Sequence, residues 1–326
     1  MEFPRFIFAA FGLFLALLIA LLLPISEIST KLMLISVLGC TFFQAWWMIP
    51  YTRIYPKQVL ESSGDDPDNT IRIMISNVLQ TNKNYKGLLK IVHDNDPDLL
   101  VTLESNHQWQ EHLDKLQYPF SIKCPLENLY GMHVYSKYKL IDWKIQYLIE
   151  KDIPSVHTKI ELPSGKGITA HFLHPLPPQP RNKDTSQRDA ELLTVGKSML
   201  ERKGPRIISG DLNDVAWSRT TRLFLKITKL LDPRIGRGMF NTFKADNWLA
   251  RWPLDHLFHS NHFTLKRIER LPKFGSDHFP VLIELMLEEE KRHQQNEPIA
   301  DEDEKSEARE KMKKKDISPS DVHEPM

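Results

Sequence analysis

An almost unbroken apolar run, residues 6–23, constrains this chain more than any other feature of its sequence. The run contains no charged side chain and is long enough to cross the hydrocarbon core of a bilayer as a helix. A secretory signal is the rival interpretation, but the run exceeds the usual signal core of about 7–15 residues and lacks a small-x-small cleavage site after it. We therefore predict a transmembrane helix rather than a cleaved signal or a buried helix of a soluble core.

A second apolar run covers residues 32–50 and ends near Trp46 and Trp47. Aromatic side chains of this kind are enriched at the interface between lipid and water. The short segment 24–31 separates the two runs and contains turn-forming residues. We predict that residues 1–57 form a membrane hairpin of two helices.

The basic residues around the hairpin predict its orientation. Arg5 precedes the first helix, Arg53 and Lys57 follow the second, and Lys31 is the basic residue of the turn. Because cytoplasmic loops carry an excess of lysine and arginine, both ends of the hairpin are expected in the cytoplasm. The rest of the chain would then also face the cytoplasm.

The remaining sequence divides by composition. Residues 58–70 are polar and read as a linker, residues 71–287 have the apolar patterning of a folded domain, and residues 288–326 are charged and are expected to be disordered. The whole chain holds 43 basic and 42 acidic residues, so no strong basic field indicates nucleic acid. Cys40 and Cys124 have no neighbours at metal-ligand spacing and predict no disulfide framework.

Within the domain, the apolar run of residues 206–209 breaks at Gly210 and is followed at once by Asp211 and Asn213. A strand that ends in this way presents carboxylate and amide groups at the edge of a sheet, where ligand sites of α/β proteins form. The same residue types also make ordinary surface turns. Taken alone, this motif leaves both interpretations open.

Polar side chains recur at the boundaries of other predicted strands. Residues 71–77 and 98–104 read as strands separated by a helix, which predicts adjacent parallel strands carrying their last residues to the same edge. The polar residues at or beside strand boundaries are Asn77, Glu104, His174, Asp211, Asn213, Asp255, Asp277 and His278. Each could be a cap or a turn residue by itself, but together they predict one oxygen-rich site suited to a hard cation such as Mg²⁺ or Mn²⁺.

The motifs resemble the endonuclease/exonuclease/phosphatase superfamily, which includes pancreatic deoxyribonuclease, abasic-site endonucleases, neutral sphingomyelinases and inositol polyphosphate 5-phosphatases. The resemblance covers about residues 71–287 and is closest to a membrane-anchored bacterial branch. Its motifs, in chain order, are Ser76-Asn77, Leu103-Glu104-Ser105, residues 131–136, His174, Gly210-Asp211-Leu212-Asn213, residues 254–258 and residues 275–280.

The resemblance implies a deoxyribonuclease I-like, four-layer α/β sandwich with two packed sheets flanked by helices, here preceded by the transmembrane hairpin. It also implies a divalent metal ion, Mg²⁺ or Mn²⁺, with Glu104 as the principal ligand. Asn77 and Asp277 are expected close to the same ion. The protein is then expected in a membrane, the inner membrane for a bacterial chain.

Catalytic roles follow from the same resemblance. Asp211 is expected to orient or deprotonate the attacking water, and Asn213 to hold a phosphate oxygen. His278, positioned by Asp255, is expected to face the scissile phosphate, and His174 to contact that phosphate from the other side. The implied function is hydrolysis of a phosphodiester in nucleic acid or in a phospholipid headgroup. The alternative is a noncatalytic membrane adaptor that binds a phosphate-bearing partner through the same fold.

Three nearby polar residues are expected to do something else. His171 lies three residues before His174 on a strand and therefore points to the opposite face. His256 is expected to support the turn that holds Asp255. Arg188 is expected to be a solvated residue on a helix surface, although its length would let it reach a phosphate.

Overall fold

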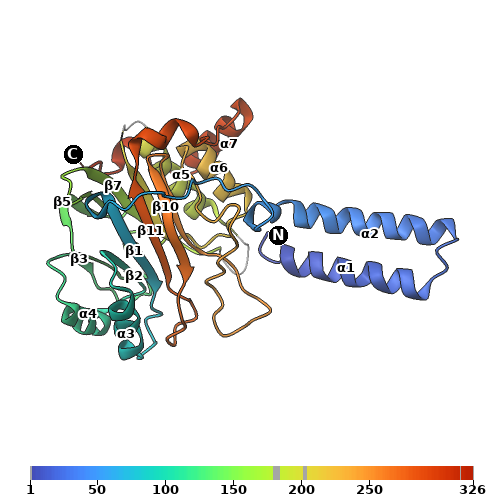
Figure 1. The fold of residues 1–326 in the computed structure, drawn as a ribbon, viewed down its shortest axis with the longest axis horizontal. Helices are drawn as coiled ribbons and strands as arrows, with labels where there is room; N and C mark the ends of the chain where they lie inside the picture. Colours follow the sequence, from blue (N-terminus) through green and yellow to red (C-terminus); the bar gives the residue numbers. More distant parts are fainter. Residues whose placement is uncertain (1, 179–183, 201–203, 316, 326) are drawn as a thin grey trace.

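The apolar segments of residues 70–287 form two β-sheets that pack face to face (Figure 1). The structure, a computed structural model, describes residues 2–178, 184–200, 204–315 and 317–325. The first sheet has the order β10-β11-β1-β2-β4-β3. Its strands are β1 (Thr70–Asn77), β2 (Leu99–Leu103), β3 (Phe120–Cys124), β4 (Met132–Ser136), β10 (Phe263–Arg270) and β11 (Val281–Leu287).

The second sheet has the order β5-β6-β7-β8-β9. Its strands are β5 (Lys139–Gln146), β6 (Ser155–Glu161), β7 (Gly167–Phe172), β8 (Arg206–Asp211) and β9 (Asp255–His259). Strands β1 and β2 pair in parallel, which confirms the adjacency predicted for residues 71–77 and 98–104. Strands β7 and β8 also pair in parallel, whereas β9 runs antiparallel to β8 and β11 runs antiparallel to β1.

Alternation along the strands divides the core into layers. In β1, Ile73 and Ile75 face the second sheet, whereas Met74 faces the helices α3 (Tyr85–Asn95) and α4 (His107–Leu113) on the outside. This is the two-residue period of a strand that is buried on both faces. The outer face of the second sheet is covered by α5 (Ser186–Leu200) and α6 (Arg219–Thr228). The predicted four-layer α/β sandwich is thus confirmed.

The covering helices are α3 (Tyr85–Asn95), α4 (His107–Leu113), α5 (Ser186–Leu200) and α6 (Arg219–Thr228). Short 3₁₀ turns occupy Ile49–Tyr51, Pro67–Asn69, Asp114–Leu116, Glu289–Gln294 and Pro319–Asp321.

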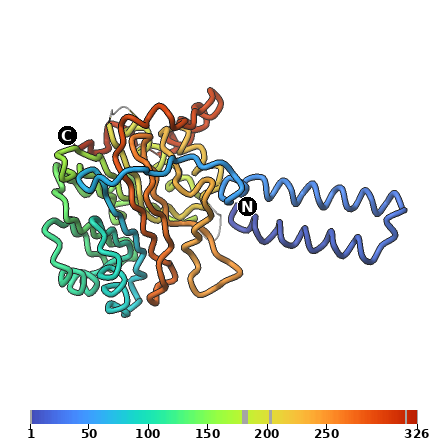
Figure 2. The backbone as a smooth tube through the Cα atoms, in the orientation of Figure 1, coloured from blue at the N-terminus to red at the C-terminus, as the bar shows by residue number. Residues whose placement is uncertain are grey.

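The N-terminal runs form two antiparallel helices, α1 (Arg5–Leu22) and α2 (Ile28–Trp46), which project from one side of the sandwich (Figures 1 and 2). Both are long and apolar enough to cross a membrane, and most of their side chains are exposed in the structure. The second helix begins earlier and ends earlier than the predicted range 32–50. Its polar first turn extends the helix beyond the apolar run on which that prediction rested.

The charged C-terminal segment differs from the expected disordered tail. It contains α7 (Glu302–Lys313), which begins with a capping box between Asp301 and Glu304. Ala308 and Met312, one helical turn apart, are buried against α5 and α6. Two apolar residues in so charged a segment are too few to predict this packing from the pattern alone.

Candidate active site

The chain brings the predicted polar residues together at one end of both sheets. Asn77 ends β1, Asp211 ends β8, and Glu104 and His174 follow β2 and β7 closely. Asp255 begins β9, and because β9 is antiparallel to β8, its start lies beside the end of β8. In the same way β11 is antiparallel to β1, so the loop before β11 delivers Asp277 and His278 to this edge.

Special backbone conformations turn these side chains away from the strands. Gly210 has φ +145°, and a Cβ at this position would lie 1.9 Å from the carbonyl oxygen of Leu173. Glycine is therefore required where β8 passes the end of β7. Glu104 and Asn213 have φ values of 57° and 51°, in the left-handed region that non-glycine residues rarely adopt. Backbone strain of this kind is common at functional sites.

Asn77 connects the two carboxylates that come from different sheets. Its Nδ2 donates to Oε1 of Glu104 at 2.8 Å and to Oδ2 of Asp211 at 3.2 Å. Its Oδ1 accepts a hydrogen bond from the backbone N–H of Leu79 at 3.1 Å. The amide therefore presents its nitrogen to both carboxylates and holds them in place.

His278 lies between two further carboxylates. Its Nδ1 contacts Oδ2 of Asp255 at 2.7 Å, and its Nε2 lies 3.6 Å from Oδ2 of Asp211. Burial would lower the pKa of His278, but Asp255 and Asp211 outweigh burial and raise it to about 10. The imidazole is therefore a cation at neutral pH, fixed in orientation by Asp255.

Asp211 and His174 have pKa values displaced in the directions that burial favours. Burial raises the pKa of Asp211 to about 7, although the charge of His278 opposes that rise. His174 Nε2 lies 3.9 Å from Asp211 Oδ2. Burial, assisted by the positive charge of His278, lowers the pKa of His174 to about 4. The site thus places a charged and a neutral imidazole near one carboxylate.

Asn213 completes the loop after β8. Its backbone N–H donates to Oδ1 of Asp211 at 2.9 Å, and its Nδ2 donates to the carbonyl oxygen of Pro175 at 2.9 Å. These bonds fix Asp211 and connect the loop after β8 with the loop after β7.

A cavity of about 980 Å³ opens over these residues. Its wall includes Glu104, His174, Asp211, Asn213, Asp277 and His278. Asn77 and Asp255 are buried behind this wall and are hydrogen-bonded to residues that form it. The structure therefore gathers all eight residues that the sequence singled out.

The donor set fits a divalent cation. Asp211, Asp255 and His278 place ligand atoms within 4.8 Å of one another, but the charge of His278 already compensates these carboxylates. Glu104 and Asp277 have no lysine or arginine partner among the described residues. Burial raises the pKa of Glu104, although the hydrogen bond from Asn77 and the charge of His278 oppose that rise. Two carboxylates that face a cavity without such a partner are ligands that a hard cation prefers.

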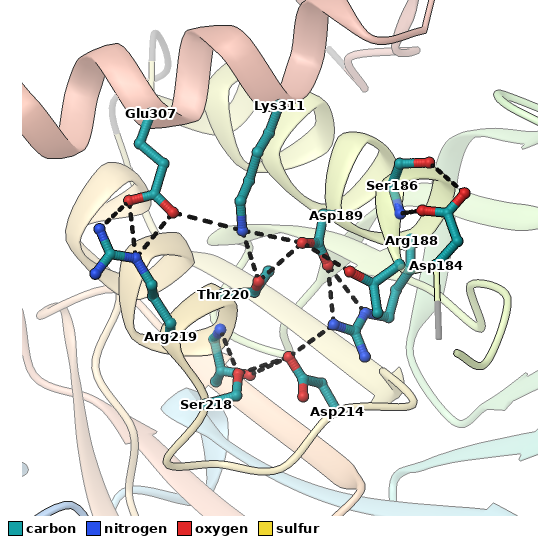
Figure 3. Close-up of polar contacts among 12 residues, drawn as sticks. Asp184, Ser186, Arg188, Asp189, Asp214, Ser218, Arg219, Thr220, Glu307 and Lys311 are labelled. Atoms are coloured by element: carbon teal, nitrogen blue, oxygen red, sulfur yellow. Dashed lines mark hydrogen bonds and ion pairs between the residues drawn. The ribbon is translucent and has the colours of Figure 1, made fainter. Parts of the chain in front are cut away.

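The structure corrects the expectation for Arg188. This side chain is buried, and its Nη1 donates to the carbonyl oxygen of Asn213 at 2.8 Å. Its Nη2 lies 2.9 Å from Asp189 and 3.1 Å from Asp214, as Figure 3 shows. Arg188 therefore supports the loop that carries Asp211 to Asp214. The sequence signal for the pair between Arg188 and Asp214 was the position of Asp214, directly after the Gly-Asp-Leu-Asn motif.

The other two histidines have structural surroundings. His256 Nε2 contacts the carbonyl oxygen of Asp214 at 2.8 Å, and Arg234 Nη2 contacts its Nδ1 at 2.7 Å. It thus supports the loop after β8 as well as its own turn. His171 is buried and contacts His157 through their Nδ1 atoms, on the face of β7 expected to point away from the site.

Comparison with known proteins agrees with this fold. No curated protein matches the sequence. Among solved structures, the fold is similar to the catalytic domain of human Nocturnin, with 17% identity, a TM-score of 0.56 and coverage of 73% of this chain and 99% of that one. A family protein from Bacteroides thetaiotaomicron has 17% identity, a TM-score of 0.55 and coverage of 69% and 97%.

TDP2 from D. rerio, in complex with a single-strand DNA product, has 14% identity and a TM-score of 0.53, with coverage of 66% of this chain and 98% of that one. At these identities the similarity concerns the fold. The sequence model of the Endonuclease/Exonuclease/phosphatase family matches residues 74–278, from β1 to His278. With this match over most of the chain and with the strand-end site in place, the protein belongs to the Endonuclease/Exonuclease/phosphatase family.

Proposed function

We propose that this protein is a membrane-anchored, divalent-metal-dependent phosphodiesterase. The observation that carries the proposal is the position of Asp211, which lies between Asn77 and His278 on the wall of a cavity. The family generally hydrolyses phosphoester bonds, which supports an enzyme of this class.

A phosphodiester is an anion that repels hydroxide, and its transition state spreads negative charge over the non-bridging oxygens. Preorganised positive charge and hydrogen-bond donors are therefore the main source of catalysis. Asp211, whose pKa is raised to about 7, is suited to orient the attacking water and to accept its proton. The buried cation of His278 is suited to donate to a phosphate oxygen, because Asp255 occupies its other ring nitrogen.

Two further groups would hold the phosphate. His174 is neutral at pH 7 and lies on the other side of Asp211, where its ring can donate one hydrogen bond. Asn213 would contact a phosphate oxygen through the amide proton that is not bonded to Pro175. Together these groups surround a site for one tetrahedral anion.

Glu104 and Asp277 are the residues proposed to hold Mg²⁺ or Mn²⁺, with Asn77 orienting Glu104. When bound, the ion would stabilise charge on the phosphate oxygens and on the leaving oxygen. The surroundings of Glu104 support this assignment, since burial of its carboxylate raises its pKa and disfavours its charge.

Helices α1 and α2 are proposed to span the membrane, with both ends and the catalytic domain in the cytoplasm. Their length, their hydropathy and the exposure of their apolar side chains support the anchor. The substrate is then a phosphodiester of nucleic acid or of a phospholipid headgroup. Single-strand DNA is the product bound to the structurally similar TDP2 of D. rerio.

The test is hydrolysis of bis(p-nitrophenyl) phosphate by the purified full-length protein. We expect turnover with Mg²⁺ or Mn²⁺, loss of turnover with a chelator, and loss in the Asp211→Asn and His278→Ala variants. Asp94→Asn and His93→Ala, on the exposed surface of α3, are matched controls that should retain full activity. A folded protein without metal-dependent turnover would favour the noncatalytic adaptor instead.

A further inference from the structure

The base of the hairpin is fixed against the loops that build the catalytic cavity. Trp217 Nε1 donates to the carbonyl oxygen of Glu2 at 2.8 Å, and Trp252 Nε1 donates to that of Phe3 at 2.6 Å. The hydroxyl of Tyr51, just after α2, donates to the carbonyl oxygen of Ala216 at 2.7 Å. Both ends of the hairpin are therefore attached to the segments that follow Asp211 and precede Asp255.

This attachment makes the start of α1 a part of the cavity. Glu2, Phe3 and Pro4 line the same cavity as His174 and the catalytic residues of the strand ends. The exposed apolar surface of α1 begins at Phe6, only three residues after Phe3. Pro4 lines the cavity and directly precedes Arg5, the first residue of α1, so the cavity wall lies within one helical turn, about 5 Å of rise, of the first membrane-facing turn. The cavity therefore opens at the level of the bilayer surface if α1 spans the bilayer.

A loop beside the cavity exposes two large apolar side chains. Phe243 lines the cavity at the start of the loop, and Trp252 packs against Phe3 at its end, with ring centroids 6.0 Å apart. Between them, Trp248 is 77% exposed and Leu249 is 62% exposed. Figures 1 and 2 show this loop, residues 244–251, projecting on the side from which the hairpin leaves the sandwich. Tryptophan and leucine exposed together at such a place are typical of insertion into a membrane interface.

The charges of the cavity disfavour a polynucleotide. The lysine and arginine residues of its described wall are Arg188, Arg219 and Lys311, and each forms ion pairs with carboxylates of the protein. A nucleic acid would need unpaired cations for the phosphates that flank the scissile one. The rest of the wall includes the apolar residues Phe3, Pro4, Leu129, Tyr130, Pro177, Pro178, Phe243 and Leu254. Such a wall suits one phosphate attached to a lipid.

We infer that the substrate is a membrane phospholipid, which enters the cavity from the bilayer between the base of α1 and the inserted loop 244–251. The inference rests on the proposed phosphodiesterase function and assigns its substrate class. Water would form a new bond to phosphorus and one phosphorus–oxygen ester bond would break. The leaving oxygen would take a proton, so that the products are an alcohol and a phosphomonoester.

The experiment compares two substrates with the full-length protein reconstituted in vesicles of phosphatidylethanolamine and phosphatidylglycerol with Mg²⁺. Lipid products, diacylglycerol or phosphatidic acid, are measured by mass spectrometry, and bis(p-nitrophenyl) phosphate reports the soluble reaction. We expect the double change Trp248→Ala and Leu249→Ala to slow lipid hydrolysis about tenfold, since burial of one large apolar side chain corresponds to at least that factor. The soluble reaction should be unchanged.

Trp143→Ala is the matched control, because Trp143 is 52% exposed on β5, at the end of the sandwich far from the hairpin. It should affect neither reaction. The lipid inference is overturned if the protein cleaves the soluble diester but leaves the phospholipids intact, or prefers single-stranded DNA or RNA to them. It is also overturned if the loop variant and the Trp143 variant hydrolyse lipid equally well. Absence of turnover on every substrate would instead remove the phosphodiesterase proposal itself.

Discussion

Two groups of buried charges lie at or directly behind the wall of the same cavity, and they differ in how their charges are compensated. At the strand ends, the carboxylates of Asp211 and Asp255 share the single cation of His278. Between α5, α6 and α7, the single carboxylate of Asp189 contacts two cations, Arg188 and Lys311. It also accepts a hydrogen bond from the hydroxyl of Thr220 (Figure 3). We call the first group the strand-end cluster and the second the helix network.

The difference appears in the protonation of the two groups. Burial raises the pKa of both carboxyls, but in Asp189 the charges of Arg188 and Lys311 outweigh burial and lower it. In Asp211 burial prevails and the pKa rises to about 7. Asp255 Oδ1 and His174 Nδ1 also lack hydrogen-bond partners among the described residues. Groups left unsatisfied in this way are expected where a ligand supplies the missing partner, whereas satisfied groups stabilise the fold.

The largest expected effect is on activity, at the strand-end cluster. Asp211→Asn keeps the shape of the side chain but removes the proposed base, so we expect kcat on a soluble diester to fall by about 10²–10⁴-fold. The unfolding free energy should be retained or increased, because a buried carboxyl with a raised pKa disfavours the folded state at neutral pH, where the unfolded chain ionises freely. Steady-state kinetics and urea denaturation measure the two quantities. A large loss of stability would place Asp211 with the helix network instead.

The next effect is on stability, in the helix network. Arg188→Met would leave Asp189 and Asp214 with less compensation and would remove the hydrogen bond to the carbonyl oxygen of Asn213. We expect a loss of about 3–5 kcal/mol in unfolding free energy, as for the breaking of other buried ion pairs. Urea denaturation monitored by circular dichroism provides the measurement. A loss below about 1 kcal/mol would contradict the assignment, because it is typical of exposed pairs.

These two predictions also show what the sequence could and could not provide. The residues at the strand ends were predictable because Asn77, Glu104 and Asp211 lie at or directly after the end of an apolar run, and parallel strands carry their ends to one edge. Arg188 was not, because its burial depends on Asp214, which no periodicity connects with α5. Local patterns find side chains at element ends, whereas pairs between distant elements require the packed structure.

The same limit applies to the two ends of the chain. The hairpin was predictable from its length and hydropathy, but its attachment to the cavity depends on contacts of Glu2 and Phe3 with Trp217 and Trp252. In α7, Lys311 is one charged residue among many in the sequence, yet its Nζ lies 3.0 Å from Asp189. A charged segment that completes a buried network has no distinctive composition.

Glu191, on α5 like Arg188, gives a smaller and pH-dependent test. Among the described residues it has no cationic partner, and burial raises its pKa to about 8. The carboxyl is thus protonated in the folded protein up to about pH 8 but ionises near pH 4.5 when unfolded. Its contribution to stability is full below pH 4.5 and is lost as the pH rises towards 8.

We therefore expect Glu191→Gln to match the wild type near pH 4.5 and to be more stable by about 2–4 kcal/mol near pH 8.5. Thermal or urea unfolding across this range measures the difference. The same change at Glu302, which is exposed at the start of α7, should give no such pH dependence and serves as the control. A constant difference between Glu191→Gln and the wild type at every pH would mean that Glu191 is ionised in the folded protein.

The smallest effect is expected at the exposed edge of the helix network. Arg219 contacts Glu307 of α7 through its Nε at 3.0 Å, but 68% of its side chain is exposed. Water and salt screen such a pair, so Arg219→Ala should cost less than about 1 kcal/mol, and the cost should shrink at high salt. Urea denaturation at low and high salt measures both. If Arg219→Ala were as costly as Arg188→Met, the docking of α7 would depend on its outer charges rather than on Lys311 and the buried Ala308 and Met312.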